Sequence, residues 1–269
     1  MGTRRIALST AKIGAEVRDG IGWLTIDNPA RRNALSLEMW AGLGEAAAAF
    51  ESDPEVRVVV IHGAGGKSFA AGADISEFEQ SRASAEQRRS YGEIAARGQQ
   101  GLARLARPLV AMVRGHAIGG GLAIALEADV RFATPASRFG IPAARLGLGY
   151  EYAGIAKLAR LVGPATCKDM LFSARQLDAQ EALRVGLVNF VVEDEAIAAR
   201  VNEYVAGIAA NAPLTVRAAK AAVQAFERYS DVAAAAEVAP LVDACFDSED
   251  YREGRRAFME KRPPRFVGR

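Results

Sequence analysis

The pattern of apolar and polar residues divides the chain into a first part that alternates strands with helices and a later part that is almost wholly helical. Two predominantly apolar runs, 56–61 and 109–113, predict fully buried strands. Near the start, Asp19-Gly20 lies between two short apolar segments and tolerates positive φ, so we expect a β-hairpin there. After about residue 153, only 188–192 has the pattern of a strand. The order of elements predicts an α/β fold followed by a helical region.

Polar residues mark where several helices are expected to begin. Ser36 precedes an apolar-periodic run that ends before Pro54, and Asp178 and Ser248 stand in the same place before later helices. These residue types accept hydrogen bonds from the first backbone NH groups of a helix. The segment 127–129, with the sequence Glu-Ala-Asp, has the pattern of a helix end at the surface.

Composition narrows the class of protein. The chain has 269 residues, of which 50% are hydrophobic, and a formal net charge of +2. This balance gives no reason to expect nucleic acid or an anionic membrane as a partner. No apolar stretch is long enough for a signal sequence or a membrane span. Cys167 and Cys245 lie far apart without metal-ligand spacing, so we expect a cytoplasmic protein with no metal site and no disulfide framework.

Two glycine-containing segments follow the two buried strands. They are residues 69–75, FAAGADI, and residues 115–121, GHAIGGG. A helix that starts where a strand stops leaves backbone NH groups without partners, and glycine lets the backbone approach a ligand closely. Two such turns side by side would direct two NH donors at one oxygen, which is an oxyanion hole. The alternative is a pair of tight turns that serve helix packing alone. Neither segment has the lysine or the glycine spacing of a nucleotide-binding loop.

Several motifs, in order along the chain, resemble those of the enoyl-CoA hydratase/isomerase (crotonase) family. They are Asn28-Pro29-Ala30-Arg31-Arg32-Asn33-Ala34-Leu35, the two glycine segments, Phe139-Gly140-Ile141-Pro142, residues 176–192 and residues 257–262. The resemblance covers roughly residues 15–266. It implies a spiral core of repeated ββα units, assigned to residues 1–195, and a helical C-terminal trimerisation region, assigned to 196–269. It also implies a homotrimer or a dimer of trimers.

The resemblance implies an acyl-CoA thioester as substrate, with coenzyme A carried as part of it and no separate cofactor. Ala73 and Gly120 fall where the family holds the thioester oxygen with backbone NH groups. The positions at which family members contact the CoA moiety correspond here to Arg32, Ala34, Ala71, Asp74 and Ile75. Phe258 and Lys261 fall where a neighbouring subunit often completes that site.

The chain departs from the family pattern at the residues that transfer protons. Family hydratases carry two glutamates where this chain has Ala123 and Ala143, and alanine cannot transfer a proton. Glu151 falls where dienoyl-CoA isomerases of the family hold a catalytic aspartate, and Tyr150 falls where a methylmalonyl-CoA decarboxylase has a pocket tyrosine. Such decarboxylases tend to place histidine at the position of Ala73.

Three functions remain open from the sequence. The first is an enoyl-CoA isomerase or hydratase-type lyase in which Glu151 carries the proton. The second is a decarboxylase of malonyl-type acyl-CoA, which needs an enolate sink but less acid–base help. The third is a catalytically silent protein with this fold that binds CoA thioesters.

Overall fold

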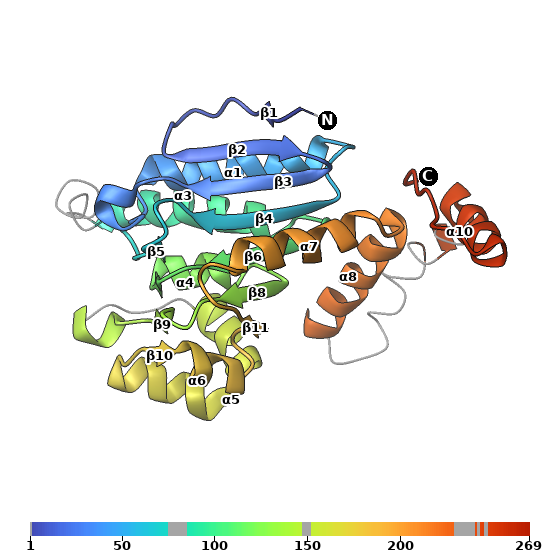
Figure 1. Ribbon diagram of the computed structural model, residues 1–269. Coiled ribbons are helices and arrows are strands. Elements are labelled where there is room, and N and C mark those ends of the chain that lie inside the picture. Colours follow the sequence, from blue (N-terminus) through green and yellow to red (C-terminus); the bar gives the residue numbers. More distant parts are fainter. Residues whose placement is uncertain (1, 75–84, 147–151, 229–239, 241–242, 245–246) are drawn as a thin grey trace.

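The computed structural model describes residues 2–74, 85–146, 152–228, 240, 243–244 and 247–269. Two β-sheets form the centre of the molecule, and helices cover them (Figure 1). The larger sheet contains, in spatial order, β1 (Arg4–Arg5), β2 (Ile13–Arg18), β3 (Ile21–Ile26), β4 (Val58–Gly63), β6 (Leu109–Val113), β8 (Val130–Ala133) and β11 (Phe190–Val191). The smaller sheet contains β10 (Leu177–Asp178), β9 (Arg138–Gly140), β7 (His116–Ile118) and β5 (Ser68–Ala70). The predicted α/β class is confirmed.

Helices lie on both sides of the larger sheet. They are η1 (Pro29–Arg31), α1 (Leu37–Ser52), α3 (Ala85–Ala103), α4 (Gly120–Ala125), η3 (Ala143–Leu146), α5 (Tyr152–Ser173), α6 (Ala179–Arg184), α7 (Ile197–Ala209), α8 (Pro213–Arg228) and α10 (Glu249–Glu260). Figure 1 shows α1 and α3 behind the sheet, α7 in front of it, and α8 and α10 to one side. In the described part of the chain, every helix is too short or too polar to cross a lipid bilayer.

The predicted hairpin is confirmed at the start of the larger sheet. β2 and β3 pair antiparallel, with Arg18 opposite Ile21. Asp19 and Gly20 between them have φ of 52° and 76°. A two-residue hairpin turn needs left-handed backbone at both central positions, and this dipeptide supplies it.

Strand β4 is covered on both faces, and this accounts for its consecutive apolar residues. Val59 and Ile61 face the core shared with α1 and α3, whereas Val58 and Val60 face the core shared with α7. Successive side chains of a strand point to opposite faces, so a strand covered on both faces must be apolar at every position. This strand pairs parallel with β3 and β6.

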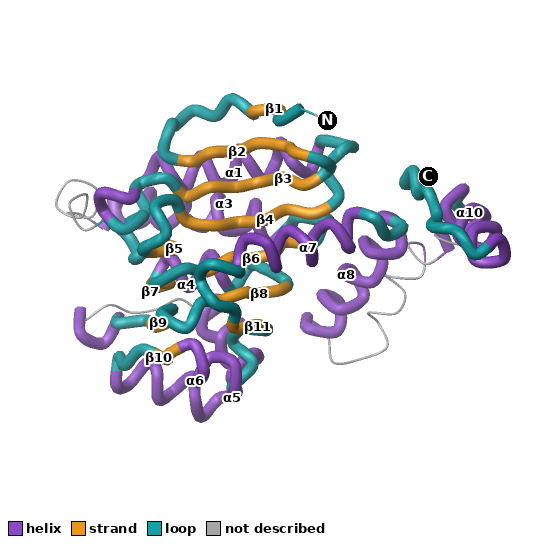
Figure 2. Tube along the Cα trace, in the orientation of Figure 1, coloured by secondary structure: helices purple, strands orange, loops and turns teal. Residues whose placement is uncertain are grey.

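The smaller sheet is the element that the apolar pattern does not predict. Figure 2 shows β5, β7, β9 and β10 one above another beside the larger sheet. Each has only two or three residues. Strands this short contain too few positions to display a period of two. At the sequence level they are part of the glycine segments, the 139–142 motif and the 176–192 motif.

The predicted helix starts differ in whether the capping bond forms. Asp178 makes a capping box with Glu181 at the start of α6. The Ser248 hydroxyl accepts from the Tyr251 NH, 3.0 Å away, before α10. Ser36 precedes α1 as predicted, but it makes no side-chain capping bond, and its buried hydroxyl has no partner among the described residues. The residue type therefore marked all three helix starts, while the bond itself formed at two.

The C-terminal helices fall into two groups. α7 belongs to the core, because Ile197, Val201 and Val205 pack with the sheet residues of the second core. α8, by contrast, presents Val223 and Phe226 to solvent, with 58% and 78% of their surfaces exposed. The division into residues 1–195 and 196–269 stays a prediction.

Candidate active site

Parallel pairing of β5 with β7 brings the two glycine turns together. Ser68 lies opposite His116, and Ala70 opposite Ala117. Each strand runs within two residues into a glycine of positive φ, namely Gly72 at 104° and Gly119 at 53°. A Cβ atom built on Gly119 would lie 3.9 Å from the Gly72 Cα, and one built on Gly72 would lie 3.3 Å from the Ile118 carbonyl oxygen. The backbones of the two turns therefore lie side by side.

The pairing of Leu35 fixes the direction of the Ala73 backbone. The Leu35 NH donates to the Gly72 carbonyl oxygen at 2.8 Å, and the Leu35 carbonyl accepts from the Asp74 NH at 2.9 Å. Ala73 is thus the residue opposite Leu35 in a parallel bridge. The Ala73 NH belongs to the same peptide group as the Gly72 carbonyl, and in a trans peptide the C=O and the NH point in opposite directions, so this NH faces away from Leu35.

Gly120 presents its NH from the neighbouring turn. It is the first residue of α4, and the first NH groups of a helix have no intrahelical acceptor. The next residue, Gly121, holds the helix against β5, since a Cβ there would lie 2.0 Å from the Ala70 carbonyl oxygen. Leu35 connects the two turns: its backbone pairs beside Ala73, and its side chain would lie 3.3 Å from a Cβ at Gly120.

The described residues expected to contact CoA lie on the segments around Ala73 and Gly120. The Arg32 carbonyl accepts from the Ala71 NH at 3.1 Å, and the Ala34 carbonyl accepts from the Asn28 side chain at 3.0 Å. Asp74 is 9% exposed and pairs with Arg31 at 3.3 Å. The predicted CoA contact Ile75 lies outside the described residues.

Asn33 is a residue whose role the motif resemblance did not identify. Its side chain is completely buried. The Nδ2 group donates to the Ser68 and Ala64 carbonyls at 2.7 and 3.0 Å, and the Oδ1 atom accepts from the Asn28 NH at 2.9 Å. Asn33 therefore ties the segment that carries Leu35 to β5, the strand that leads to Ala73.

The two alanines at the usual acid–base positions are buried. Ala123 lies one turn after Gly120 on α4, and its NH donates to the Gly119 carbonyl at 2.9 Å. Ala143 begins η3. Each is 8% exposed, and neither methyl group can accept or donate a proton. The predicted Tyr150 and Glu151 lie outside the described residues.

One chain does not bring Phe258 and Lys261 to the glycine turns. Phe258 belongs to α10, and Lys261 follows that helix with an exposed side chain and φ of 52°. Figure 1 shows α10 at the far side of the molecule from α4. If these residues contribute to the site, they do so from another copy of the chain.

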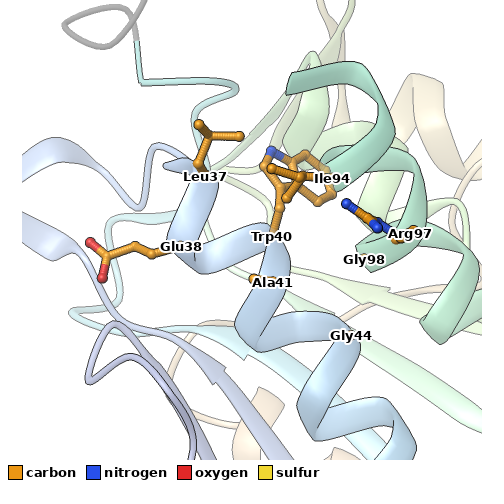
Figure 3. Close-up of a pocket in the computed structure, with 8 residues that line it drawn as sticks. All are labelled: Leu37, Glu38, Trp40, Ala41, Gly44, Ile94, Arg97 and Gly98. Atoms are coloured by element: carbon orange, nitrogen blue, oxygen red, sulfur yellow. The ribbon is translucent and has the colours of Figure 1, made fainter. Parts of the chain in front are cut away.

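Trp40 contacts Gly120 from the side of α1. A Cβ built on Gly120 would lie 3.2 Å from Trp40 Cζ2, and the indole NH donates to the Tyr91 hydroxyl at 3.3 Å. Figure 3 shows Trp40 and Ile94 between α1 and α3, at a groove of about 440 Å³. Sequence alone indicates only a core position for Trp40, because it falls on the apolar face of a helix.

Glu127 corrects the expectation of a surface helix end. Its side chain is only 4% exposed and pairs with Lys157 at 2.5 Å. Gln99 donates to its other oxygen at 2.8 Å. A carboxylate next to the polar residues of a helix end is usually solvated, and only the packing of α3 and α5 over this end of α4 buries it. Within the described ranges, no group of three or more His, Cys, Asp or Glu residues is arranged to hold a metal ion.

Comparison with known proteins identifies the family of the chain. A family model described as Enoyl-CoA hydratase/isomerase matches residues 16–269. A short-chain-enoyl-CoA hydratase of Clostridium acetobutylicum is 36% identical over 239 residues, which cover 89% of this chain and 91% of that protein. A crotonyl-CoA hydratase of Syntrophomonas wolfei is 35% identical over 255 residues, which cover 94% of this chain and 97% of that protein.

Solved structures give the same result for the fold. The crystal structure of an enoyl-CoA hydratase/carnithine racemase from Magnetospirillum magneticum has a TM-score of 0.90 to this chain, with 37% sequence identity and coverage of 97% of each chain. The two sheets and the C-terminal helices are therefore those of the crotonase fold. The chain belongs to the enoyl-CoA hydratase/isomerase family.

Proposed function

We propose that this acyl-CoA enzyme stabilises a thioester enolate through the backbone NH groups of Ala73 and Gly120. The observation that carries the proposal is the close approach of the two turns at the end of the paired strands β5 and β7, where a Cβ added to Gly72 would lie 3.3 Å from the Ile118 carbonyl oxygen. When an electron pair moves into the thioester carbonyl, negative charge gathers on its oxygen. Two donors fixed by the fold favour that charged state over the ground state, and this difference is what lowers the barrier.

The reaction that we propose first is an isomerisation or a hydratase-type lyase reaction, with Glu151 as the proton carrier. In the isomerisation, the carboxylate removes a proton from one carbon of the acyl chain and the electron pair moves into the carbonyl to give the oxyanion. The electron pair then returns, and the proton is delivered to a different carbon, so no atom is gained or lost. Glu151 takes this role because Ala123 and Ala143 have only methyl groups.

Decarboxylation of a malonyl-type acyl-CoA is the second candidate. The bond to the carboxylate breaks, carbon dioxide leaves, and the electron pair forms the same enolate, which then takes a proton from solvent. The two alanines favour this reaction because it uses the oxyanion donors without a glutamate pair. Tyr150 would line the pocket. Binding of enoyl, dienoyl and malonyl thioesters without any turnover would instead indicate a catalytically silent CoA-thioester-binding protein.

We also propose that the CoA site is completed between copies of the chain. The contacts proposed within one chain are Arg32, Ala34, Ala71, Asp74 and Ile75. Phe258 and Lys261 would come from the neighbouring copy. The exposed Val223 and Phe226 of α8 form apolar surface that such a copy would cover. The proposed assembly is a homotrimer or a dimer of trimers, and a sedimentation mass equal to one chain would contradict it.

The test compares two variants of Gly120 that both add a Cβ atom but differ in whether the backbone NH group remains. Gly120→Pro lacks the NH, and Gly120→Ala keeps it, while both add a Cβ against Trp40 and Leu35. Proline is tolerated at the first position of a helix. We expect turnover of the best substrate in an enoyl, dienoyl and malonyl-CoA panel to fall roughly 100- to 1000-fold further in the proline variant than in the alanine variant.

A second donor gives an independent check. Ala73→Pro removes the other NH but leaves the two hydrogen bonds of Leu35, which use the Gly72 carbonyl and the Asp74 NH. Circular dichroism and oligomer mass must match the unmodified protein. Equal turnover in the proline and alanine variants of Gly120, in a folded protein, would contradict the oxyanion assignment.

A further inference from the structure

The far end of α4 is fixed to the rest of the fold by three charged residues at alternating positions. Asp129 accepts from the Leu109 NH at 2.7 Å and from Lys220 at 2.8 Å. Arg131 is 3% exposed and donates to the Leu187 carbonyl at 2.7 Å and to the Ala125 and Ala128 carbonyls at the end of α4. These two residues hold the helix end to the sheet.

Glu127, the third of these residues, makes its bonds to other helices. One carboxylate oxygen accepts from Gln99 of α3 at 2.8 Å, and the other accepts from Lys157 of α5 at 2.5 Å. Each oxygen thus has a partner on a different helix. The Glu127 side chain is only 4% exposed and the Lys157 side chain 36%, so solvent competes little for the carboxylate.

The helices joined by Glu127 are those that follow the segments of the proposed site. α4 begins with Gly120, α3 follows residues 75–84, and α5 begins at Tyr152, directly after Tyr150 and Glu151. Glu127 is seven residues after Gly120, which is roughly 10 Å along a helix axis. It is therefore too far away to touch the thioester oxygen, but it sets where α3 and α5 stand relative to the helix that presents the Gly120 NH.

A buried carboxylate is a poor choice if stability alone is required. Replacing a buried ion pair by apolar residues of similar volume is often neutral or stabilising. Apolar contacts, however, tolerate sliding of one helix along another, whereas two hydrogen bonds to separate oxygens fix direction and register within tenths of an ångström. Misplacement of reacting groups by about 1 Å can cost on the order of 100-fold in rate.

We propose that Glu127 is a positioning residue that holds α3 and α5 in register with α4, through Gln99 and Lys157, for the reaction at the Gly120 NH. This inference rests on the proposed function. It assigns to Glu127 no contact with the substrate and no proton transfer.

The chain supplies a matched control for its test. Lys157→Met removes the cation from Glu127, and Lys220→Met makes the same chemical change at the Asp129 pair, which joins α8 to the start of β6. We expect Lys157→Met to lower kcat by about tenfold or more with KM changed less than about threefold, because misalignment affects the transition state more than binding of the CoA moiety. Both variants should lower the melting temperature by a similar amount, since each removes one cation from a carboxylate. Lys220→Met should nevertheless leave kcat within about twofold.

Two further measurements keep the proposal open to contradiction. Glu127→Gln retains a side chain of the same shape with one acceptor oxygen, so its kcat should fall between those of the unmodified protein and Glu127→Leu. Hydrogen–deuterium exchange should rise in peptides of α3 and α5 in Lys157→Met and not across the whole protein. This readout needs no activity, so it separates failure of the inference from failure of the proposed function, which the Gly120 variants report. Unchanged kcat in Lys157→Met, or an equal loss in Lys220→Met, would overturn the proposal.

Discussion

The two halves of the candidate site are built in different ways. The oxyanion half consists of backbone groups, and its parts lie in the core: β5 and β7 pair in parallel, and Leu35, with no exposed surface, contacts both turns. The acid–base half consists of side chains, and at its two usual positions this chain has Ala123 and Ala143. The first half follows from the fold, whereas the second is set by single residues that the fold does not require.

This difference teaches how one fold accommodates several reactions. Only proline removes a backbone NH group. A side chain at Gly72 would press on the Ile118 carbonyl oxygen at 3.3 Å, and one at Gly121 would meet the Ala70 carbonyl oxygen at 2.0 Å. An alanine in place of a glutamate at position 123 or 143 leaves that backbone unchanged. Family membership therefore predicts stabilisation of a thioester oxyanion, while in our proposal the fate of the proton depends on the side chain of Glu151.

The largest expected effect concerns the missing glutamates. We expect the unmodified protein to hydrate crotonyl-CoA roughly 100- to 10,000-fold more slowly than a family hydratase that carries both glutamates, because the water has no acid–base pair. The double variant Ala123→Glu/Ala143→Glu should regain at least about tenfold, and the matched pair Ala123→Gln/Ala143→Gln should not. Steady-state hydration rates would check this, and a high rate in the unmodified protein would show that another residue activates the water.

A smaller effect is expected at Glu151. Glu151→Gln keeps size and hydrogen bonding but cannot accept a proton, so an isomerase should lose about 100-fold in turnover with little change in substrate binding. Exchange of solvent deuterium into the substrate α carbon gives a second readout of the same proton transfer. If turnover and exchange both stay at the level of the unmodified protein, the carboxylate is not the proton carrier, and decarboxylation or silent binding becomes the better proposal.

The smallest effect on turnover is expected where a side chain supports the backbone half. Asn33→Ala removes three buried hydrogen bonds, so the free energy of unfolding should fall by about 2 kcal/mol or more. Turnover should fall by less than about tenfold, since the NH groups remain. Ser36→Ala is the control: its buried hydroxyl has no partner in the described part of the chain, so its unfolding free energy should change by less than about 0.5 kcal/mol. Equal denaturation midpoints for the two variants would contradict the role of Asn33.

Many local features of the fold were correctly predicted from the sequence. The hairpin turn at Asp19-Gly20, the strand 109–113 and the capping residues Asp178 and Ser248 are confirmed. Each depends on a property that a short stretch of sequence specifies: a turn conformation, a continuous apolar run or a hydrogen bond between near neighbours. The pairing of β5 with β7 could not be predicted in this way, because it joins residues 48 positions apart through strands of three residues.

The sequence by itself determined the α/β class, the family and the residue types available for chemistry, including the absence of a carboxylate at positions 123 and 143. Those properties follow from periodicity, turn residues and ordered motifs, which need no knowledge of distant contacts. Only the tertiary structure decided that the two glycine turns touch, that Asn33 and Leu35 hold them, and that Glu127 is buried between α3, α4 and α5. Burial and long-range hydrogen bonds arise when segments far apart in the chain pack together, and no local pattern of residues encodes which segments those are.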